Sequence, residues 1–140
     1  MQHLVIPEGV KVIEEEAFAW SFIRDISLPS SLTLIGERAF YTSYSLENIV
    51  IPGGVKIIEA NAFDSCNNLK KVVIQEGVTS IGTHAFLSCF NASVEIPKSV
   101  TEFGGGAFSG VKEIVISQGS RADEYVKWNG PYETFEVKYR

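Results

Sequence analysis

Two cysteines are the residues of this chain best suited to covalent chemistry. Cys66 and Cys89 stand 23 positions apart, and the sequence repeats at nearly the same interval, so both side chains are expected to lie over one another in neighbouring units. Strand-like spacing between the units is within the Cα range of a disulfide. Parallel stacking points both side chains the same way, and Ser21 and Ser43 occupy equivalent positions, which favours small buried thiols. Disulfide and free thiols remain the two alternatives.

The other reactive side chains do not converge on one place. His3 and His84 fall in different repeats, so no metal site with three or four ligands is predicted. The glycine run 104–106 lacks the Lys-Ser/Thr of a phosphate loop and indicates a tight turn, and the glutamate run 14–16 indicates solvated surface. The register places no serine beside both a histidine and a carboxylate. We therefore predict no enzyme and no cofactor.

The elements that position these residues are internal repeats. The dipeptide Ala-Phe occurs five times, at positions 17–18, 39–40, 62–63, 85–86 and 107–108, in steps of 22 or 23 residues. A repeat this short cannot enclose its own apolar face, so it must stack on its neighbours. The period predicts a solenoid.

Each repeat carries the same apolar rows. Two aliphatic rows spaced two residues apart predict a strand with one inward face: Leu4, Ile26, Ile49, Val72, Val94 and Ile114, then Ile6, Leu28, Ile51, Ile74, Ile96 and Ile116. A second apolar pair follows in each repeat, ending at Ile13, Ile35, Ile58, Ile81 and Phe103. The residues before Ala-Phe form a polar or small outward row: Glu16, Arg38, Asn61, His84 and Gly106. All length variation follows Phe, which marks the tolerant loop.

One position breaks the pattern. Asn91 falls in a row whose other members are Met1, Ile23, Leu46, Leu69 and Val111. We expect a local irregularity there, with the neighbouring Phe90 turning inward to fill the slot.

The spacing L-x-x-I-x-I-P, V-x-x-I and A-F, with Cys or Ser three residues beyond, resembles the BspA-type leucine-rich repeats of bacterial and protist surface proteins. The segment LKKVVIQEGVTSIGTHAFLSC, from Leu69 to Cys89, fits this pattern closely. The resemblance covers about residues 1–116. Together with the rows, it implies a β-rich, right-handed leucine-rich repeat solenoid of about five and a half coils over residues 1–118.

The two ends differ. Residues 119–140 are predicted to form a C-terminal cap of the same domain, with Ser120 starting a helix, Gly130-Pro131 ending it, and a final strand alternating at Phe135, Val137 and Tyr139. No equivalent cap precedes Met1. The first coil therefore presents an open edge, which either continues into further coils of a larger protein, the interpretation we favour, or allows self-association.

Composition limits the partners. The net charge is -5 with Lys and Arg scattered, which argues against nucleic acid, and no apolar stretch is long enough for membrane insertion. The outward strand rows offer a protein-binding face, on which Asn48, Val50, Lys71 and Val73 are the predicted central residues. Solvent-facing valine is also what strand propensity alone gives.

We therefore predict a noncatalytic protein–protein interaction module, which the resemblance connects with adhesion or host-component binding by a secreted or surface-anchored bacterial protein. A structural spacer and a carbohydrate-binding module are the alternatives. The outward strand rows contain no aromatic residue, but Trp20, Phe22, Tyr41 and Tyr44 gather near the variable loops, where a small glycan site is the second possibility.

Overall fold

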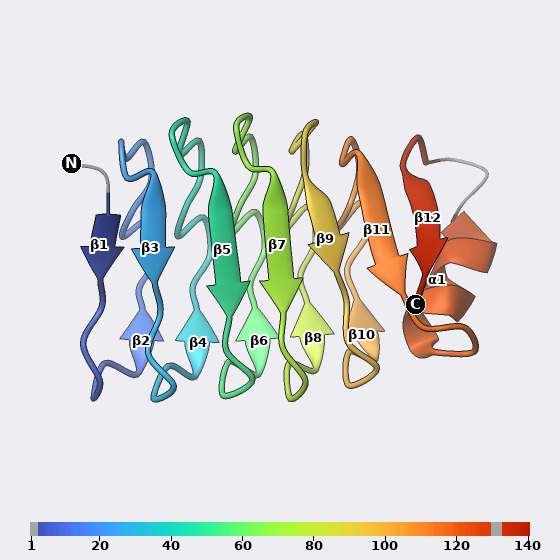
Figure 1. Ribbon diagram of the computed structural model, residues 1–140, viewed down its shortest axis with the longest axis horizontal. Helices are drawn as coiled ribbons and strands as arrows, with labels where there is room; N and C mark the ends of the chain where they lie inside the picture. Colours follow the sequence, from blue (N-terminus) through green and yellow to red (C-terminus); the bar gives the residue numbers. More distant parts are fainter. Residues whose placement is uncertain (1–2, 130–132) are drawn as a thin grey trace.

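The computed structural model describes residues 3–129 and 133–140, and it shows a parallel β-solenoid. Each coil runs down one strand of a front sheet, turns, and returns along a short strand of a rear sheet (Figure 1). The connections from the rear sheet to the next front strand lie along the top edge of that view. The predicted repeat architecture is confirmed.

The front sheet has seven strands, all parallel to their neighbours. In spatial order they are β1 (His3–Val5), β3 (Asp25–Ser27), β5 (Asn48–Ile51), β7 (Lys71–Ile74), β9 (Ser93–Glu95), β11 (Glu113–Ile116) and β12 (Glu136–Tyr139). Inward and outward residues alternate along them: Ile49 and Ile51 of β5 are buried, whereas Asn48 and Val50 are exposed. This is the alternation that the aliphatic rows predict.

The rear sheet has five two-residue strands, each of which ends at the last residue of a second apolar pair. They are β2 (Val12–Ile13), β4 (Leu34–Ile35), β6 (Ile57–Ile58), β8 (Ser80–Ile81) and β10 (Glu102–Phe103). The second residue is buried in the first four strands. Inward aliphatic side chains of both sheets thus form one continuous core.

The Ala-Phe turns close the third side of every coil. Phe40, Phe63, Phe86 and Phe108 are all fully or almost fully buried, and consecutive rings stack with centroids 5.0 to 5.8 Å apart. Phe18 continues the stack at 5.3 Å from Phe40, but it is only partly buried. The stack follows from the repeat, because identical backbone paths place identical side chains in register.

Two residues of each turn adopt a left-handed backbone conformation. The row before Ala-Phe has φ between 54° and 62° in every coil: Glu16, Arg38, Asn61, His84 and Gly106. His84 is exposed, as predicted. The second left-handed row lies two residues after Phe in the first four coils: Trp20, Thr42, Ser65 and Ser88, with Gly110 in the fifth. The sequence pattern shows the polarity of the first row but not its conformation.

The local irregularity predicted at Asn91 is present, but Phe90 does not turn inward to fill the slot. Phe90 is 61% exposed, and Ala92 occupies the buried slot with its N–H donating to the Cys89 carbonyl, as Leu69 does to Cys66. Asn91 instead matches Asn68, since both side-chain amides donate to a carbonyl of the preceding coil. The chain is one residue shorter between Ala92 and Val94 than in the coil before, which shifts the register.

The C-terminal cap forms as predicted. Helix α1 (Arg121–Asn129) begins after Ser120, whose hydroxyl accepts the Asp123 N–H at 3.2 Å, and β12 pairs with β11 beyond the last coil. The predicted stop at Gly130-Pro131 lies outside the described residues, as does Met1. Tyr125 of α1 stacks on Phe103 at 4.8 Å. Phe103 therefore replaces the usual isoleucine where the last coil meets the helix.

The buried carboxylate Asp123 joins the helix and the strand of the cap. It accepts the Gly119 N–H at 2.8 Å and the Tyr139 hydroxyl at 2.8 Å. These hydrogen bonds, the backbone one foremost, lower the pKa of Asp123. At the other end, β1 and β2 are the terminal strands of their sheets among the described residues. Pairing of that edge with a second copy stays a prediction.

Candidate functional site

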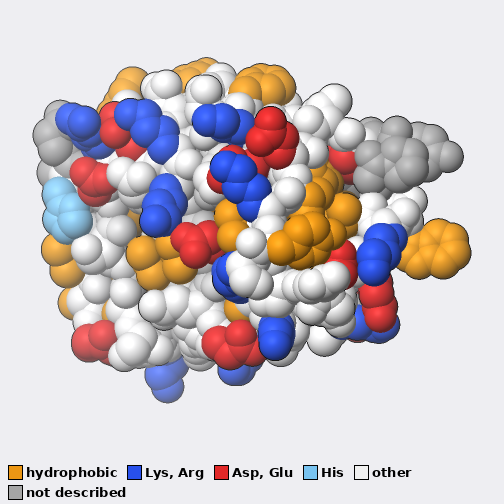
Figure 2. Space-filling model, turned by 45° about the vertical axis from the view of Figure 1, so that its right-hand side comes forward, with side chains coloured by type: hydrophobic (Ala, Val, Ile, Leu, Met, Phe, Trp, Pro, Cys, Tyr) orange, Lys and Arg blue, Asp and Glu red, His pale blue; other side chains and the backbone are white. Residues whose placement is uncertain are grey.

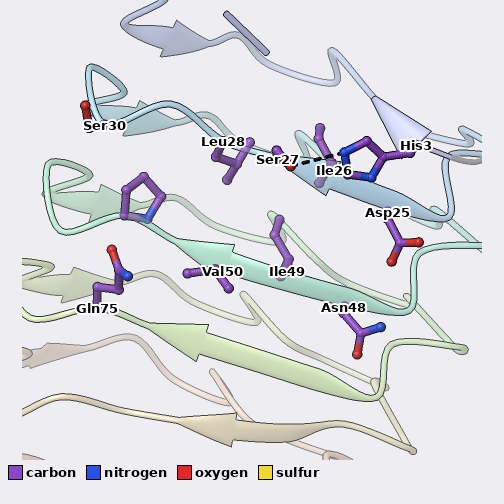
Figure 3. A pocket seen from close by; sticks show the side chains of 11 residues that line it. His3, Asp25, Ile26, Ser27, Leu28, Ser30, Asn48, Ile49, Val50 and Gln75 are labelled. Carbon is purple, nitrogen blue, oxygen red and sulfur yellow. Dashed lines mark hydrogen bonds between the residues drawn. The ribbon is translucent and has the colours of Figure 1, made fainter. Parts of the chain in front are cut away.

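A hollow of about 520 Å³ opens on the outer face of the front sheet, over β1, β3 and β5 (Figure 3). It exists because Ser27 is small and stands between Val5 and Val50 in the outward row, so a shallow depression replaces a third valine. Its lining mixes polar and apolar side chains: His3, Asp25, Ser27, Leu28, Asn48, Val50, Pro52 and Gln75 among them.

The four predicted binding residues lie together on this face. Cα pairing sets Asn48 beside Lys71 and Val50 beside Val73 in neighbouring strands. Asn48 and Val50 line the hollow, and Lys71 and Val73 form its border toward the C-terminal end. The Lys71 ammonium lies 3.8 Å from the Glu95 carboxylate. The four residues thus share the outward face of the sheet, and their binding role stays a prediction.

The structure corrects one expectation about the serines. Ser27 Oγ lies 3.2 Å from His3 Nε2, and Asp25 is the strand partner of His3, so a serine, a histidine and a carboxylate do share one spot. The Asp25 carboxylate points away from the imidazole in Figure 3, and the two form no ion pair among the described interactions. Because the ring lacks an orienting carboxylate, the trio does not have the arrangement of a catalytic triad.

The C-terminal half of the same face is dominated by ion pairs. Glu113 accepts the Ser93 hydroxyl at 2.7 Å and pairs with the Lys138 ammonium at 3.0 Å. These contacts, the serine hydrogen bond first, lower the pKa of Glu113, while the carboxylate raises the pKa of Lys138. Figure 2 shows this face obliquely, with positive and negative side chains interspersed and hydrophobic ones exposed between them. The face thus suits a partner with both apolar and polar groups.

Cys66 and Cys89 are free thiols, and both are fully buried. Each Sγ donates to a phenylalanine carbonyl one coil earlier, Cys66 to Phe40 at 3.1 Å and Cys89 to Phe63 at 3.0 Å. Ser43 does the same with its hydroxyl at 2.8 Å. Hydrogen bonding with Cys66 and burial raise the pKa of Cys89. The cysteines are therefore core residues of the turn, as the parallel stacking favours.

Among residues 3–129 and 133–140, no group of three or more His, Cys, Asp or Glu side chains is arranged to hold a metal ion. Within the same residues, no helix has the length and apolar character needed to cross a membrane.

Comparison with known proteins identifies the family of this solenoid. Residues 1–115 match the model of the BspA type leucine rich repeat region, in six copies. The chain belongs to this family. No curated protein matches the sequence at a significant level. Repeats of the BspA type account for every coil described above, and the C-terminal cap follows the matched region.

Solved structures resemble this BspA-type solenoid. The leucine-rich repeat protein TpLRR of T. pallidum is 32% identical with a TM-score of 0.74, over 81% of this chain and 57% of TpLRR. A leucine-rich cell surface protein from Faecalibacterium prausnitzii A2-165 is 29% identical with a TM-score of 0.55, over 81% of this chain and 41% of that one. The pneumococcal vaccine antigen PcpA is 26% identical with a TM-score of 0.68, over 84% of this chain and 31% of PcpA.

This chain therefore spans between 31% and 57% of the length of the proteins it resembles. The similarity covers the repeat fold. The activities of those longer proteins are therefore not assigned to this chain. Two of the three are described as a cell surface protein and as an antigen.

Proposed function

We propose that this BspA-type solenoid is a noncatalytic protein-recognition module of a bacterial surface or secreted protein, and that it binds a protein partner through the front sheet. Adhesion to a host component is the role we assign to it. The hollow beside solvent-facing valines is the observation that carries the proposal. Val5 is 62% and Val50 49% exposed, although both stand on a strand face that polar residues could cover.

The chemistry of the hollow supports a protein partner. Its apolar side chains supply area that a partner can remove from water, and its imidazole, carboxylate and amide groups can fix the partner's orientation. The interior strands of the front sheet, β3, β5, β7, β9 and β11, already have a paired strand on both sides, so recognition by this sheet depends on side chains and not on an added strand. Asn48, Val50, Lys71 and Val73 are the residues we propose to make the central contacts.

The test is a pair of matched variants on opposite sheets. Val50→Asp combined with Val73→Asp places charge on the front face, and Ile57→Asp places charge on the rear sheet, where Ile57 is 44% exposed. Purified host extracellular proteins are presented to each variant by surface plasmon resonance. We expect the front-face variant to lose affinity by at least about tenfold, and Ile57→Asp to bind like the unchanged protein.

All three proteins should remain folded by circular dichroism, because Val50 and Ile57 are exposed and Val73 is only half-buried. Equal affinity of the front-face variant and the unchanged protein would reject the front sheet as the site and favour a spacer role. The surface location is tested separately by antibodies on intact, unpermeabilised cells of the source organism, which should be labelled.

A further inference from the structure

A second exposed surface lies at the turn edge of the first two coils, away from the front sheet. Four aromatic residues follow the Ala-Phe dipeptides there, at Trp20, Phe22, Tyr41 and Tyr44, and the rings of Trp20, Tyr41 and Tyr44 lie together. Trp20 is 56% exposed and Phe22 76%, and Tyr44 is also exposed. Large aromatic rings are usually withdrawn from water, so a cluster that remains accessible marks a candidate contact surface.

The backbone conformation at Trp20 indicates that the fold does not require an indole at this position. The turn requires a left-handed residue at this position, and the other coils supply Thr42, Ser65, Ser88 or Gly110. Trp20 has φ of 62°, a conformation that is unfavourable for a bulky side chain. A small polar residue or glycine would adopt this turn conformation with less strain. The indole ring is therefore better explained by a contact that it makes at the protein surface.

The rings are held in a fixed arrangement. Trp20 meets Tyr41 edge-on, with centroids 5.7 Å apart and planes at 76°, and it meets Tyr44 at 6.1 Å and 67°. The Arg38 guanidinium lies 4.3 Å above the Tyr41 ring and pairs with Glu16 at 2.9 Å. Neighbours from two coils thus support the aromatic platform, defined here as Trp20, Tyr41 and Tyr44. A preorganised platform loses little entropy on binding.

The surroundings of the platform limit the ligand. Among the described contacts, the cation that stacks on the platform is Arg38, which pairs with Glu16, and the neighbouring run 14–16 is entirely glutamate. An anionic ligand would therefore meet net repulsion. The next coil adds exposed amides beside Tyr44, at Asn67 and Asn68. Polar acceptors around aromatic faces match a neutral ligand that is rich in hydroxyl groups.

We propose that the aromatic platform binds a neutral glycan. The C–H face of a pyranose ring is weakly positive and packs on the negative face of an aromatic ring, while its hydroxyls donate to the surrounding carboxylate and amide oxygens. A proline-rich peptide would use the rings but has few N–H donors, so it would leave those acceptors desolvated and unpaired. This site is separate from the front sheet, and neither proposal depends on the other.

The test uses soluble hexasaccharides as probes: cellohexaose, laminarihexaose and mannohexaose, with a heparin hexasaccharide as the anionic comparison and decaproline as the peptide comparison. The chain has two tryptophans, so the Trp128→Phe variant reports on Trp20 alone by fluorescence. Calorimetry gives the affinity independently. We expect at least one neutral hexasaccharide to change the Trp20 emission and to bind more tightly than heparin or decaproline.

Matched variants locate the site. Trp20→Ala should weaken binding about tenfold or more, and Trp20→Tyr should restore much of it. Phe90→Ala should have no effect, because Phe90 is similarly exposed in the same edge of a later coil but lacks an aromatic neighbour from the platform. Circular dichroism confirms that each variant is folded before titration.

Three results would overturn the proposal. They are no binding of any neutral hexasaccharide at millimolar concentration, binding that Trp20→Ala leaves unchanged, and tighter binding of the heparin fragment or decaproline than of every neutral probe. The last result would reassign the platform to an anionic glycan or to a proline-rich peptide. The front-sheet variants of the preceding section should bind the hexasaccharides normally, so failure of one site is distinguishable from failure of the other.

Discussion

Phe63 lies at the middle of the phenyl stack, and replacing it by alanine tests the inward assignment of the Ala-Phe dipeptides directly. The side chain is fully buried. Its ring is 5.0 Å from Phe40 and 5.1 Å from Phe86, with interplanar angles of 4° and 1°. Removing it therefore breaks two stacked pairs and opens a cavity between three coils.

The expected cost follows from these contacts. A Phe→Ala change in a packed core lowers the free energy of unfolding by about 3 to 5 kcal/mol, because the ring's transfer free energy and a cavity term add. Stiff neighbouring coils with paired backbones on both sides leave little room for collapse, which favours the upper part of that range. For a domain of this size, the loss corresponds to a fall of about 10 to 15 °C in Tm.

Urea unfolding followed by circular dichroism measures the change. Phe18→Ala is the graded control, since Phe18 is only partly buried and stacks on Phe40 alone, and its loss should be about 1 to 2 kcal/mol. Phe22→Ala removes a ring that is 76% exposed and should change stability little. Equal stability losses for Phe63→Ala and Phe22→Ala, or no loss for Phe63→Ala, would refute the reasoning.

Three further predictions concern other positions. A Cβ on Gly104 would collide with the backbone of Thr83 in the previous coil, whereas one on Gly105 would meet open space. In urea unfolding, Gly104→Ala should therefore lose more than about 2 kcal/mol and Gly105→Ala should be neutral. Cys66 and Cys89 should not react with Ellman's reagent in the folded protein, and both should react after unfolding. The mass of the protein should be the same with and without reductant. A thiol that reacts in the native state would contradict the burial of both cysteines. Because the folded pKa of Asp123 is lowered, its contribution to stability is present above the ordinary carboxyl value of roughly 4 and is lost as the pH falls through the folded value. Asp123→Asn should therefore reduce the loss of stability between about pH 6 and pH 3, measured by thermal unfolding at each pH, and an unchanged pH profile would count against this role.

Much of the fold can be predicted from the sequence because the same pattern of apolar and small residues recurs in each repeat. The five Ala-Phe dipeptides fix the period, and the aliphatic rows fix which strand face is inward. Solvent exposure of Asn48 and Val50 follows from the same alternation, as does their pairing with Lys71 and Val73. The capping serine at position 120 similarly marks the helix start.

The errors occur where a position departs from the repeat. The repeat pattern alone puts Asn91 in a buried row, with the one-residue deletion before it, whereas backbone pairing places the deletion after Ala92. Hydrophobicity alone predicts that Phe90 turns inward, but the shifted register leaves it outside. From the sequence, a one-residue deletion can be aligned at more than one position. The hydrogen bonds between coils determine which of these positions is correct.

The sequence by itself therefore determined the coil, its inward rows, its cap and the residues that reach the front face. Only the tertiary structure decided how those residues combine: the hollow that Ser27 leaves between two valines, the contact of that serine with His3, the left-handed backbone of Trp20 and the fixed angles among its neighbouring rings. The physical reason is that a repeat specifies each coil separately, whereas a surface site is made by side chains of adjacent coils whose distances are set by how the coils stack.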